Sequence, residues 1–197
     1  MEKNFAQITF TDSVKQAQER FGSREIYERV EGNLPDQSKL FQREIAHIQR
    51  MDGFYMATVG ENGWPYVQFR GGQKGFLKVL DQETLGYADF KGNMQYISTG
   101  NINATGKVAL ILLHYPTKTR LKIWAETEIL DPQEHPELRE KLVDEDYGAT
   151  VERLVILKLV AYDWNCPQHI PQRFTLEEFY DLSLTNPEMV EEICPQK

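Results

Sequence analysis

The sequence predicts an α+β protein, mainly an antiparallel β-sheet or barrel with flanking helices. Seven short apolar segments follow one another between residues 54 and 164, and most of the connections between them are too short to hold a helix. Helical patterns occur in the N-terminal third, in two interior connections and near the C-terminus. The chain has 197 residues, 41% of them hydrophobic, and no internal repeat or Gly/Ser linker. We therefore expect one domain over residues 1–197.

Residues 1–50 are expected to form a helical extension of this domain. Ser13 and Gln16 have the spacing of a capping box, which predicts a helix that begins there. Apolar residues recur near helical spacing over 36–51, which predicts another helix before the first strand.

The barrel core is expected over 53–163. A Gly- and Asn-containing turn at 60–63 separates the first two strand-like segments, which is typical of a hairpin. Helices are expected after Asn93 and around 136–143. The seven predicted strands are 54–59, 64–70, 75–80, 85–90, 107–115, 120–130 and 153–164.

The C-terminal segment, 164–197, is expected to return to helix. Thr175 and Glu178 form another capping-box pattern, and a short acidic helix is expected over 187–193. Before these helices, WNCPQHIPQRF is rich in polar side chains for a plain connection. Two interpretations of this segment stay open. Either its polar side chains contribute to a site, or Trp164 covers the core and the prolines stiffen the exit to the last helix.

Alternation along three strands predicts an apolar inner face and an outer face that carries a cation. A solvated sheet surface would show the same pattern in any single strand. The predicted outward cations are Arg70, Lys78, Arg120 and Lys122, opposite the apolar residues Val67, Phe69, Leu77, Val79, Leu121 and Ile123.

Positive charge is concentrated in the middle of an acidic chain. The net charge is −8, but residues 68–122 hold eight Lys and Arg against three Asp and Glu, a net of +5, so the remainder carries −13. This distribution favours a small phosphorylated ligand and disfavours nucleic acid. The apolar runs are shorter than a membrane span, and the first residues lack the pattern of an export signal, so we expect a cytoplasmic protein.

The turn Lys91-Gly92-Asn93 follows a predicted strand. Asn93 as an N-cap would open a helix whose first N–H groups, with Lys91, can hold a phosphate. A purely structural turn has the same composition.

Cys166 and His169 form only half of a metal-site pattern, so no metal is expected, and no catalytic residue can be assigned.

The segments QKGFLKVLD, DFKGNMQYIS and RLKIWAE together resemble the pyridoxamine 5′-phosphate oxidase-like FMN-binding split barrels, over roughly residues 40–175. The WNCPQHIPQRF segment resembles the signature of a less characterised branch. The resemblance implies a homodimer of six-stranded split barrels with FMN bound between the subunits. It implies an FMN-dependent oxidoreductase with an unknown small-molecule substrate. A non-catalytic flavin- or haem-binding carrier or sensor, or a structural dimerisation module, remains an alternative.

The resemblance also implies which residues contact the cofactor. The oxidases carry a basic pair in the phosphate turn where this chain has Met94 and Gln95, so Lys91, Arg70 or Arg120 would supply the charge. The implied flavin contacts are Gln73, Lys78, Arg120 and Lys122; the implied phosphate contacts are Asp89, Asn93 and Gln95; the C-terminal contacts are Trp164, Gln168 and Arg173.

Overall fold

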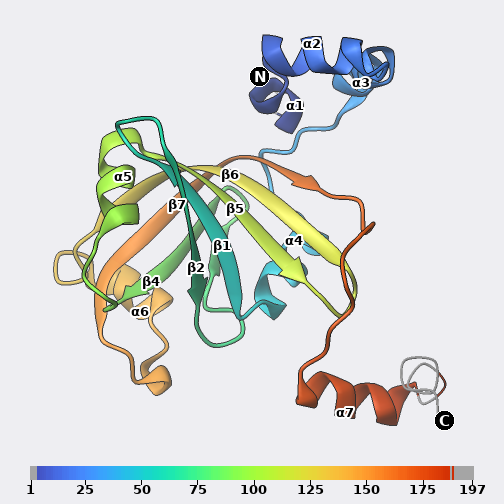
Figure 1. Ribbon diagram of the computed structural model, residues 1–197. Helices are drawn as coiled ribbons and strands as arrows, with labels where there is room; N and C mark the ends of the chain where they lie inside the picture. Colours follow the sequence, from blue (N-terminus) through green and yellow to red (C-terminus); the bar gives the residue numbers. More distant parts are fainter. Residues whose placement is uncertain (1–3, 187, 189–197) are drawn as a thin grey trace.

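One antiparallel sheet of seven strands forms the body of the protein in the computed structural model, which describes residues 4–186 and 188 (Figure 1). The strands run in the order β2-β1-β5-β6-β7-β4-β3, so β2 and β3 are its two edges. Their bounds are β1 (Gly53–Val59), β2 (Pro65–Gly71), β3 (Lys78–Asp81), β4 (Thr84–Phe90), β5 (Lys107–His114), β6 (Thr119–Leu130) and β7 (Val151–Trp164).

The observed sheet confirms the predicted α+β class with antiparallel strands. All seven apolar segments found in the sequence become strands, so the six strands implied by the family resemblance were one too few. Each segment finds an antiparallel partner, including β3, which has four residues and pairs with β4. A register shift between Trp124 and Ala125 interrupts the long β6–β7 ladder, and irregularities of this kind bend a sheet.

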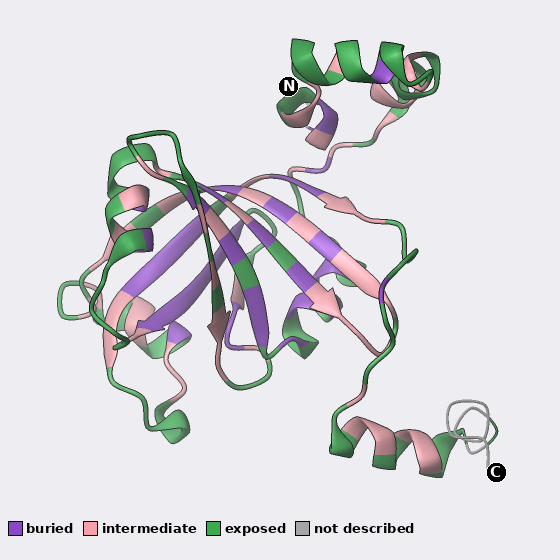
Figure 2. Cartoon of the chain, viewed as in Figure 1, coloured by how far each residue is buried: buried purple, intermediate pink, exposed green. Residues whose placement is uncertain are grey.

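The core lies inside the curled sheet, where the inward faces of the strands are buried (Figure 2). Phe54 stacks on Phe76 at 5.5 Å between ring centroids, and Tyr87 meets Phe54 edge-on at 5.4 Å. These rings come from β1, the loop before β3, and β4, so they connect strands that lie near opposite edges of the sheet. Leu121 and Ile123 on β6 are fully buried as predicted.

Strand β2 has the opposite orientation from the one predicted. Val67 and Phe69 are 59% and 54% exposed, while Tyr66, Gln68 and Arg70 are half-buried. The polar face turns inward because Arg70 reaches a buried carboxylate on β4, which the alternation pattern could not reveal.

The predicted strand over 75–80 is shorter than expected. Phe76 and Leu77 are both buried, and regular pairing begins only at Lys78. Gly75 adopts a left-handed conformation at φ 76° and donates a hydrogen bond to the Met51 carbonyl oxygen at 2.8 Å, so this part of the segment is a turn.

Helices surround the sheet unevenly. The N-terminal helices α1, α2 and α3 stand away from the barrel, and α7 lies beyond it at the other end of the chain (Figure 1). Phe5 connects α1 to the sheet by stacking on Trp124 at 6.3 Å. Bounds are α1 (Phe5–Thr9), α2 (Asp12–Arg20), α3 (Arg24–Asn33), α4 (Gln42–Arg50), α5 (Ile97–Thr105), α6 (Pro136–Leu142), a 3-10 turn (Glu145–Tyr147) and α7 (Leu176–Thr185).

The predicted helix starts were partly correct. Thr175 and Glu178 form the capping box predicted for α7, with hydrogen bonds of 3.2 and 2.8 Å. The capping box predicted at Ser13 is wrong: Thr11 is the extended N-cap residue and Ser13 lies inside α2. The helix predicted over 187–193 falls outside the described residues, apart from Glu188. No helix in the described part of the chain is long and apolar enough to cross a membrane.

Candidate functional site

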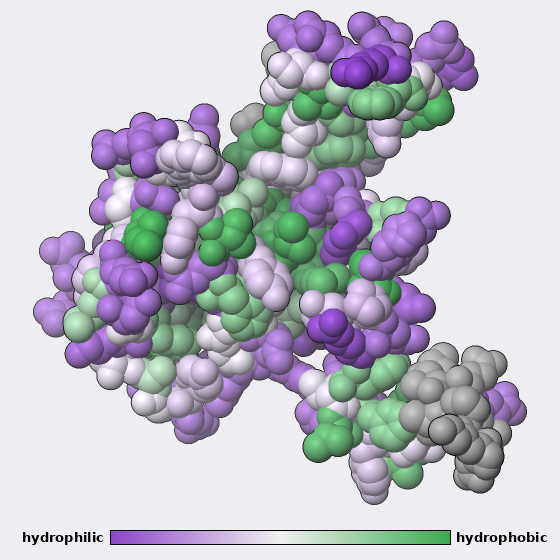
Figure 3. All heavy atoms as spheres, viewed as in Figure 1, coloured by the Kyte–Doolittle hydropathy of each residue, from purple (hydrophilic) through white to green (hydrophobic). Residues whose placement is uncertain are grey.

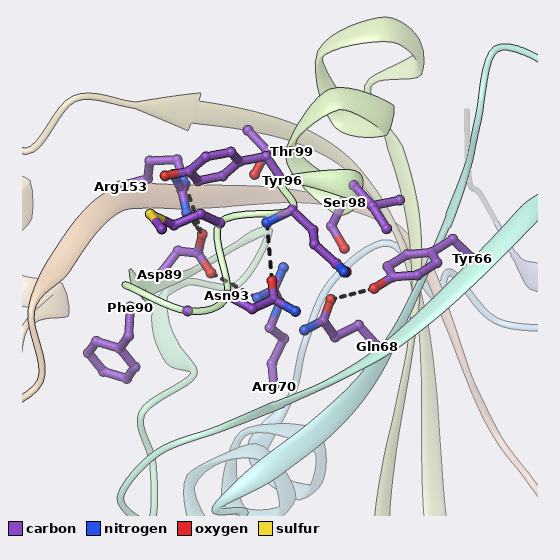
Figure 4. A pocket seen from close by; sticks show the side chains of 14 residues that line it. Tyr66, Gln68, Arg70, Asp89, Phe90, Asn93, Tyr96, Ser98, Thr99 and Arg153 are labelled. Carbon is purple, nitrogen blue, oxygen red and sulfur yellow. Dashed lines mark hydrogen bonds and ion pairs between the residues drawn. The ribbon is translucent and has the colours of Figure 1, made fainter.

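An ion pair crosses the opening between the two ends of the sheet. Arg70 on edge strand β2 places Nη1 3.2 Å from Oδ1 of Asp89 on β4. Asp89 is 4% exposed and also accepts hydrogen bonds from Nε and Nη2 of Arg153, at 2.9 and 2.7 Å. Arg153 is its register partner on β7. The carboxylate thus fixes two guanidinium groups beside one opening (Figure 4).

A pocket of about 50 Å³ lies over this ion pair, between β2, β4 and the start of α5; we call it the α5 pocket. By the same kind of measure one water needs about 10–15 Å³, so the space suits a few waters or one tetrahedral anion. The lining residues used below are Gln68, Arg70, Asp89, Asn93, Gln95, Tyr96, Ser98 and Arg153.

The N-terminus of α5 opens onto this pocket without a side-chain cap. Its N-cap residue, Tyr96, makes no capping hydrogen bond. Ser98, in the first turn, is 2% exposed, and its Oγ has no hydrogen-bond partner among the described residues. The Nε of Arg70 is also buried and has no hydrogen-bond partner among the described residues. Buried polar groups are seldom left without partners, so these two atoms are open to a water molecule or a ligand.

The turn before α5 differs from the one predicted. Asn93 is not the helix N-cap, because α5 begins at Ile97; its Oδ1 instead accepts a 3.1 Å hydrogen bond from the Gln95 backbone N–H. Met94 and Tyr96 both have left-handed backbones, at φ 61° and 51°. Such conformations are costly for non-glycine residues and cluster at functional sites.

The α5 pocket has the chemistry of an anion site. Helix N–H groups carry partial positive charge, the Ser98 hydroxyl can donate, and Arg70 and Arg153 line the pocket with one carboxylate, Asp89, while Glu152 pairs with Arg153 from outside the lining at 2.9 Å. Phosphate accepts several hydrogen bonds at once and suits such a mixed donor set.

Comparison with solved structures finds the same architecture. A candidate pyridoxamine 5′-phosphate oxidase from Lactobacillus delbrueckii superposes with a TM-score of 0.51 at 24% identity, covering 65% of this chain and 96% of that one. The fold is the pyridoxamine 5′-phosphate oxidase-like split barrel. In this chain the Arg70–Asp89 ion pair joins edge strand β2 to β4, the neighbour of the other edge strand.

Two further structures match over most of their length. HupZ of Group A Streptococcus has 13% identity and a TM-score of 0.49, covering 68% of this chain and 100% of that one. An FMN-binding protein from Syntrophomonas wolfei has 16% identity and a TM-score of 0.48, covering 79% and 96%. No protein-family model matches the sequence, and no curated protein does.

Four of the residues expected at the cofactor lie together in the split barrel. Arg70, Asp89, Asn93 and Gln95 all line the α5 pocket. Lys91 stands beside it on the exposed turn, where its backbone N–H donates to the Thr150 carbonyl oxygen at 2.8 Å.

The expected flavin-ring residues lie elsewhere in the chain. Lys78 lines a separate surface pocket, and its Nζ is 2.9 Å from Oδ2 of Asp144. Gln73 is in the exposed loop before β3, the strand that begins at Lys78. On β6, Lys122 pairs with Asp163 at 2.7 Å, and Arg120 Nη2 reaches the Cys166 carbonyl oxygen at 3.5 Å.

The three C-terminal candidates also lie apart from the α5 pocket. Trp164 donates a hydrogen bond to Glu44 on α4 and packs against the core. Arg173 lies over the Tyr115 ring, 5.0 Å from its centroid, and Gln168 is exposed. Their contact with a flavin stays a prediction.

Sequence reasoning missed several polar members of the α5 pocket, among them Gln68, Ser98 and Arg153. Gln68 accepts a 2.9 Å hydrogen bond from the Tyr66 hydroxyl, and alternation had already placed both on one face with Arg70. Ser98 lay within the quoted DFKGNMQYIS segment. Arg153 had no local signal, because only the β4–β7 register brings it to Asp89. Within the described residues, no cluster of three or more His, Cys, Asp or Glu side chains could hold a metal ion.

Proposed function

We propose that this split barrel binds FMN and holds the phosphate of the cofactor in the α5 pocket. The observation that carries the proposal is the buried, unpartnered Ser98 Oγ at the uncapped start of α5, beside the unpartnered Arg70 Nε. A phosphate there would satisfy both atoms and the helix N–H groups. The resemblance of the DFKGNMQYIS turn to FMN-binding split barrels supports the same placement.

The proposed activity is that of an FMN-dependent oxidoreductase. When bound, FMN supplies the redox chemistry, and the protein supplies binding, orientation and electrostatics. Asp89 would hold Arg70 and Arg153 ready for the phosphate, so that little side-chain order need be gained on binding. The cations on β3 and β6, Lys78 and Arg120, are the proposed contacts of the flavin ring.

A second copy of the chain is proposed to cover the outward face of β2, β1 and β5. Figure 3 shows hydrophobic residues exposed on the front of the barrel, where these strands lie in Figure 1. A monomeric soluble protein rarely leaves a contiguous apolar patch of this kind uncovered. The homodimer implied by the resemblance would bury it and complete the walls of the cofactor site. The exposed side chains of the face are Tyr55, Val59, Val67, Phe69 and Ile111.

Flavin titration of the flavin-free protein tests the proposal. We expect FMN to bind at least about tenfold more tightly than riboflavin, because only FMN carries the phosphate. Ser98→Ala should weaken FMN binding by roughly three- to tenfold, the cost of one lost hydrogen bond, and leave riboflavin binding unchanged. Ser183→Ala on α7 is the matched control. Equal affinity for the two flavins, or no binding of either, would overturn the proposal.

A further inference from the structure

A second pocket, of about 220 Å³, lies between the start of α7 and the end of the barrel. We call it the α7 pocket. Its walls come from the end of α4, the loop after β2, the end of β5 with its hairpin, and the segment that enters α7. None of its lining residues lines the α5 pocket, so the two are separate sites within the chain.

Three cationic side chains line the α7 pocket. Arg50, at the end of α4, donates from Nε to its own helix, at the Ala46 carbonyl oxygen, and Arg173 lies over Tyr115. In the part of the chain that the structure describes, neither guanidinium has a carboxylate within ion-pair distance. Lys74 is held only loosely, 3.3 Å from Glu177, with both side chains more than half exposed.

The carboxylates of the α7 pocket offset part of this charge. Glu178 is engaged, because its Oε2 accepts a hydrogen bond from the Thr175 backbone N–H at 2.8 Å. Asp52 is the second acidic lining residue. Burial, aided by Arg50 and Lys74 and opposed by Glu178 and Asp52, lowers the pKa of His114 below its usual value, so this imidazole is neutral at pH 7. Among the lining residues, Arg50, Lys74 and Arg173 face Asp52 and Glu178, a net charge of +1 that suits a monoanion; Glu177, the partner of Lys74, lies outside the lining.

Apolar side chains complete the walls. Leu113 and Met51 come from the barrel side, and Phe174 comes from the segment before α7. The volume is below the roughly 300–1,000 Å³ of pockets for drug-sized ligands, so the space suits a small molecule. An anionic group at one end and an apolar body at the other would match this lining.

We propose that the α7 pocket binds a small organic monocarboxylate. The carboxylate would be held by Arg50 and Arg173, whose planar donor pairs match its two oxygens, and the apolar body would rest on Leu113 and Phe174. A phosphate dianion fits less well, because the lining charge is +1 and Met51, Leu113, Pro116 and Phe174 form an apolar part of the wall.

Ligand-observed NMR with benzoate as the probe tests this site without any flavin. Benzoate should bind saturably to the wild-type protein and at least about tenfold more tightly than benzamide, its neutral counterpart. Arg50→Gln and Arg173→Gln should each weaken benzoate binding about tenfold or more. Arg29→Gln, an exposed guanidinium on α3 outside the pocket, is the matched control and should change nothing.

The outcomes separate this proposal from the flavin site. Arg50 is exposed and forms no flavin contact proposed above, so Arg50→Gln should keep its fold and its FMN affinity while losing benzoate. Equal binding of benzoate and benzamide, absence of saturable binding, or unchanged affinity in Arg50→Gln would overturn the site. Displacement of benzoate by equimolar inorganic phosphate would overturn the choice of a carboxylate.

Discussion

The indole Nε1 of Trp164 donates a 2.7 Å hydrogen bond to Oε1 of Glu44, a residue that lies 120 positions earlier in the chain. Glu44 is 4% exposed, and its other oxygen accepts from the Phe41 backbone N–H at 3.1 Å. The Arg43 guanidinium lies 4.2 Å from the indole ring. The end of β7 is thereby fixed to α4, and the C-terminal segment leaves the barrel from a defined point.

Trp164→Phe should destabilise the protein by about 1–3 kcal/mol. The ring packing is largely kept, but Oε1 of the buried Glu44 carboxylate loses its donor. Urea unfolding followed by circular dichroism measures the change. Trp64→Phe is the control, because Trp64 is exposed on the turn before β2 and should alter stability by less than about 0.5 kcal/mol. Equal effects of the two variants would contradict the role given to Trp164.

Stability should fall in mild acid because of His47. Burial, the largest cause, lowers the pKa of His47 to about 4 from the usual 6.5, and its Nε2–H donates to the Leu112 carbonyl oxygen at 3.2 Å. The unfolded state therefore binds a proton first, so the contribution is complete above about pH 6.5 and is lost as the pH falls towards 4. We expect the free energy of unfolding to fall by an amount on the order of 2 kcal/mol over this range.

His47→Gln removes this titrating group and should flatten the dependence of unfolding free energy on pH between about 6.5 and 4. His114 is shifted in the same direction and remains in the variant, so a smaller slope should persist. Denaturant unfolding at several pH values measures both. An unchanged slope in His47→Gln would show that other groups cause the acid sensitivity.

Asp89→Asn should cost about 2–4 kcal/mol of stability. The change removes the carboxylate that Arg70 and Arg153 share, so Arg70 loses its ion pair and Arg153 keeps only the one with Glu152. Glu177→Gln, which removes the exposed ion pair with Lys74, is the control and should cost less than about 0.5 kcal/mol. Thermal or urea unfolding compares the two. A small effect at Asp89 would mean that the barrel does not depend on this ion pair.

Val67→Asp should turn the proposed dimer into a monomer. Val67 is at the exposed face of β2, where a buried, unpaired carboxylate in an interface would be strongly unfavourable. Ile26→Asp on α3 is the control, an equally exposed apolar residue away from that face. Light scattering coupled to size-exclusion chromatography reports the mass. A monomeric wild-type protein, or a dimeric Val67→Asp, would exclude this face as the interface.

Lys78→Ala and Arg120→Ala should each weaken FMN binding by roughly 1.5–3 kcal/mol, the scale of one lost charged hydrogen bond. Lys39→Ala, an exposed lysine paired with Glu83, is the control. The same flavin titration serves as the measurement. Unchanged affinity in both variants would remove them from the ring site while leaving the Ser98 and Arg70 assignments in place.

Local patterns in the sequence predicted the elements well and their orientation less well. Alternation on β6 placed Leu121 and Ile123 inside correctly, because hydrophobic burial decided that strand. On β2 the same rule turned Val67 and Phe69 inward, and it failed because the inward side chain of Arg70 satisfies the buried charge of Asp89. A pattern of apolar residues cannot show a charge partner on another strand.

The candidate site was predictable in part for the same reason. Asn93 and Gln95 belong to a local turn whose composition is visible in the sequence. Arg153 depends on the β4–β7 register, and the importance of Ser98 depends on its burial, which is a property of the folded barrel. Asn93 was wrongly predicted to be the N-cap of α5. Its side chain instead accepts a hydrogen bond within a short turn, and such a turn has nearly the same composition as a helix start.

The α5 pocket draws on β2, β4, α5 and β7, elements spread over most of the chain, so it exists only when the sheet has curled far enough for Arg70 to meet Asp89. An unfolded or half-assembled chain offers no equivalent group of donors. An anion that binds there therefore stabilises the folded state alone, and the melting temperature should rise with the concentration of the anion. Availability of the ligand in the cell would then govern how much of the chain persists in the folded form, as well as how much is occupied.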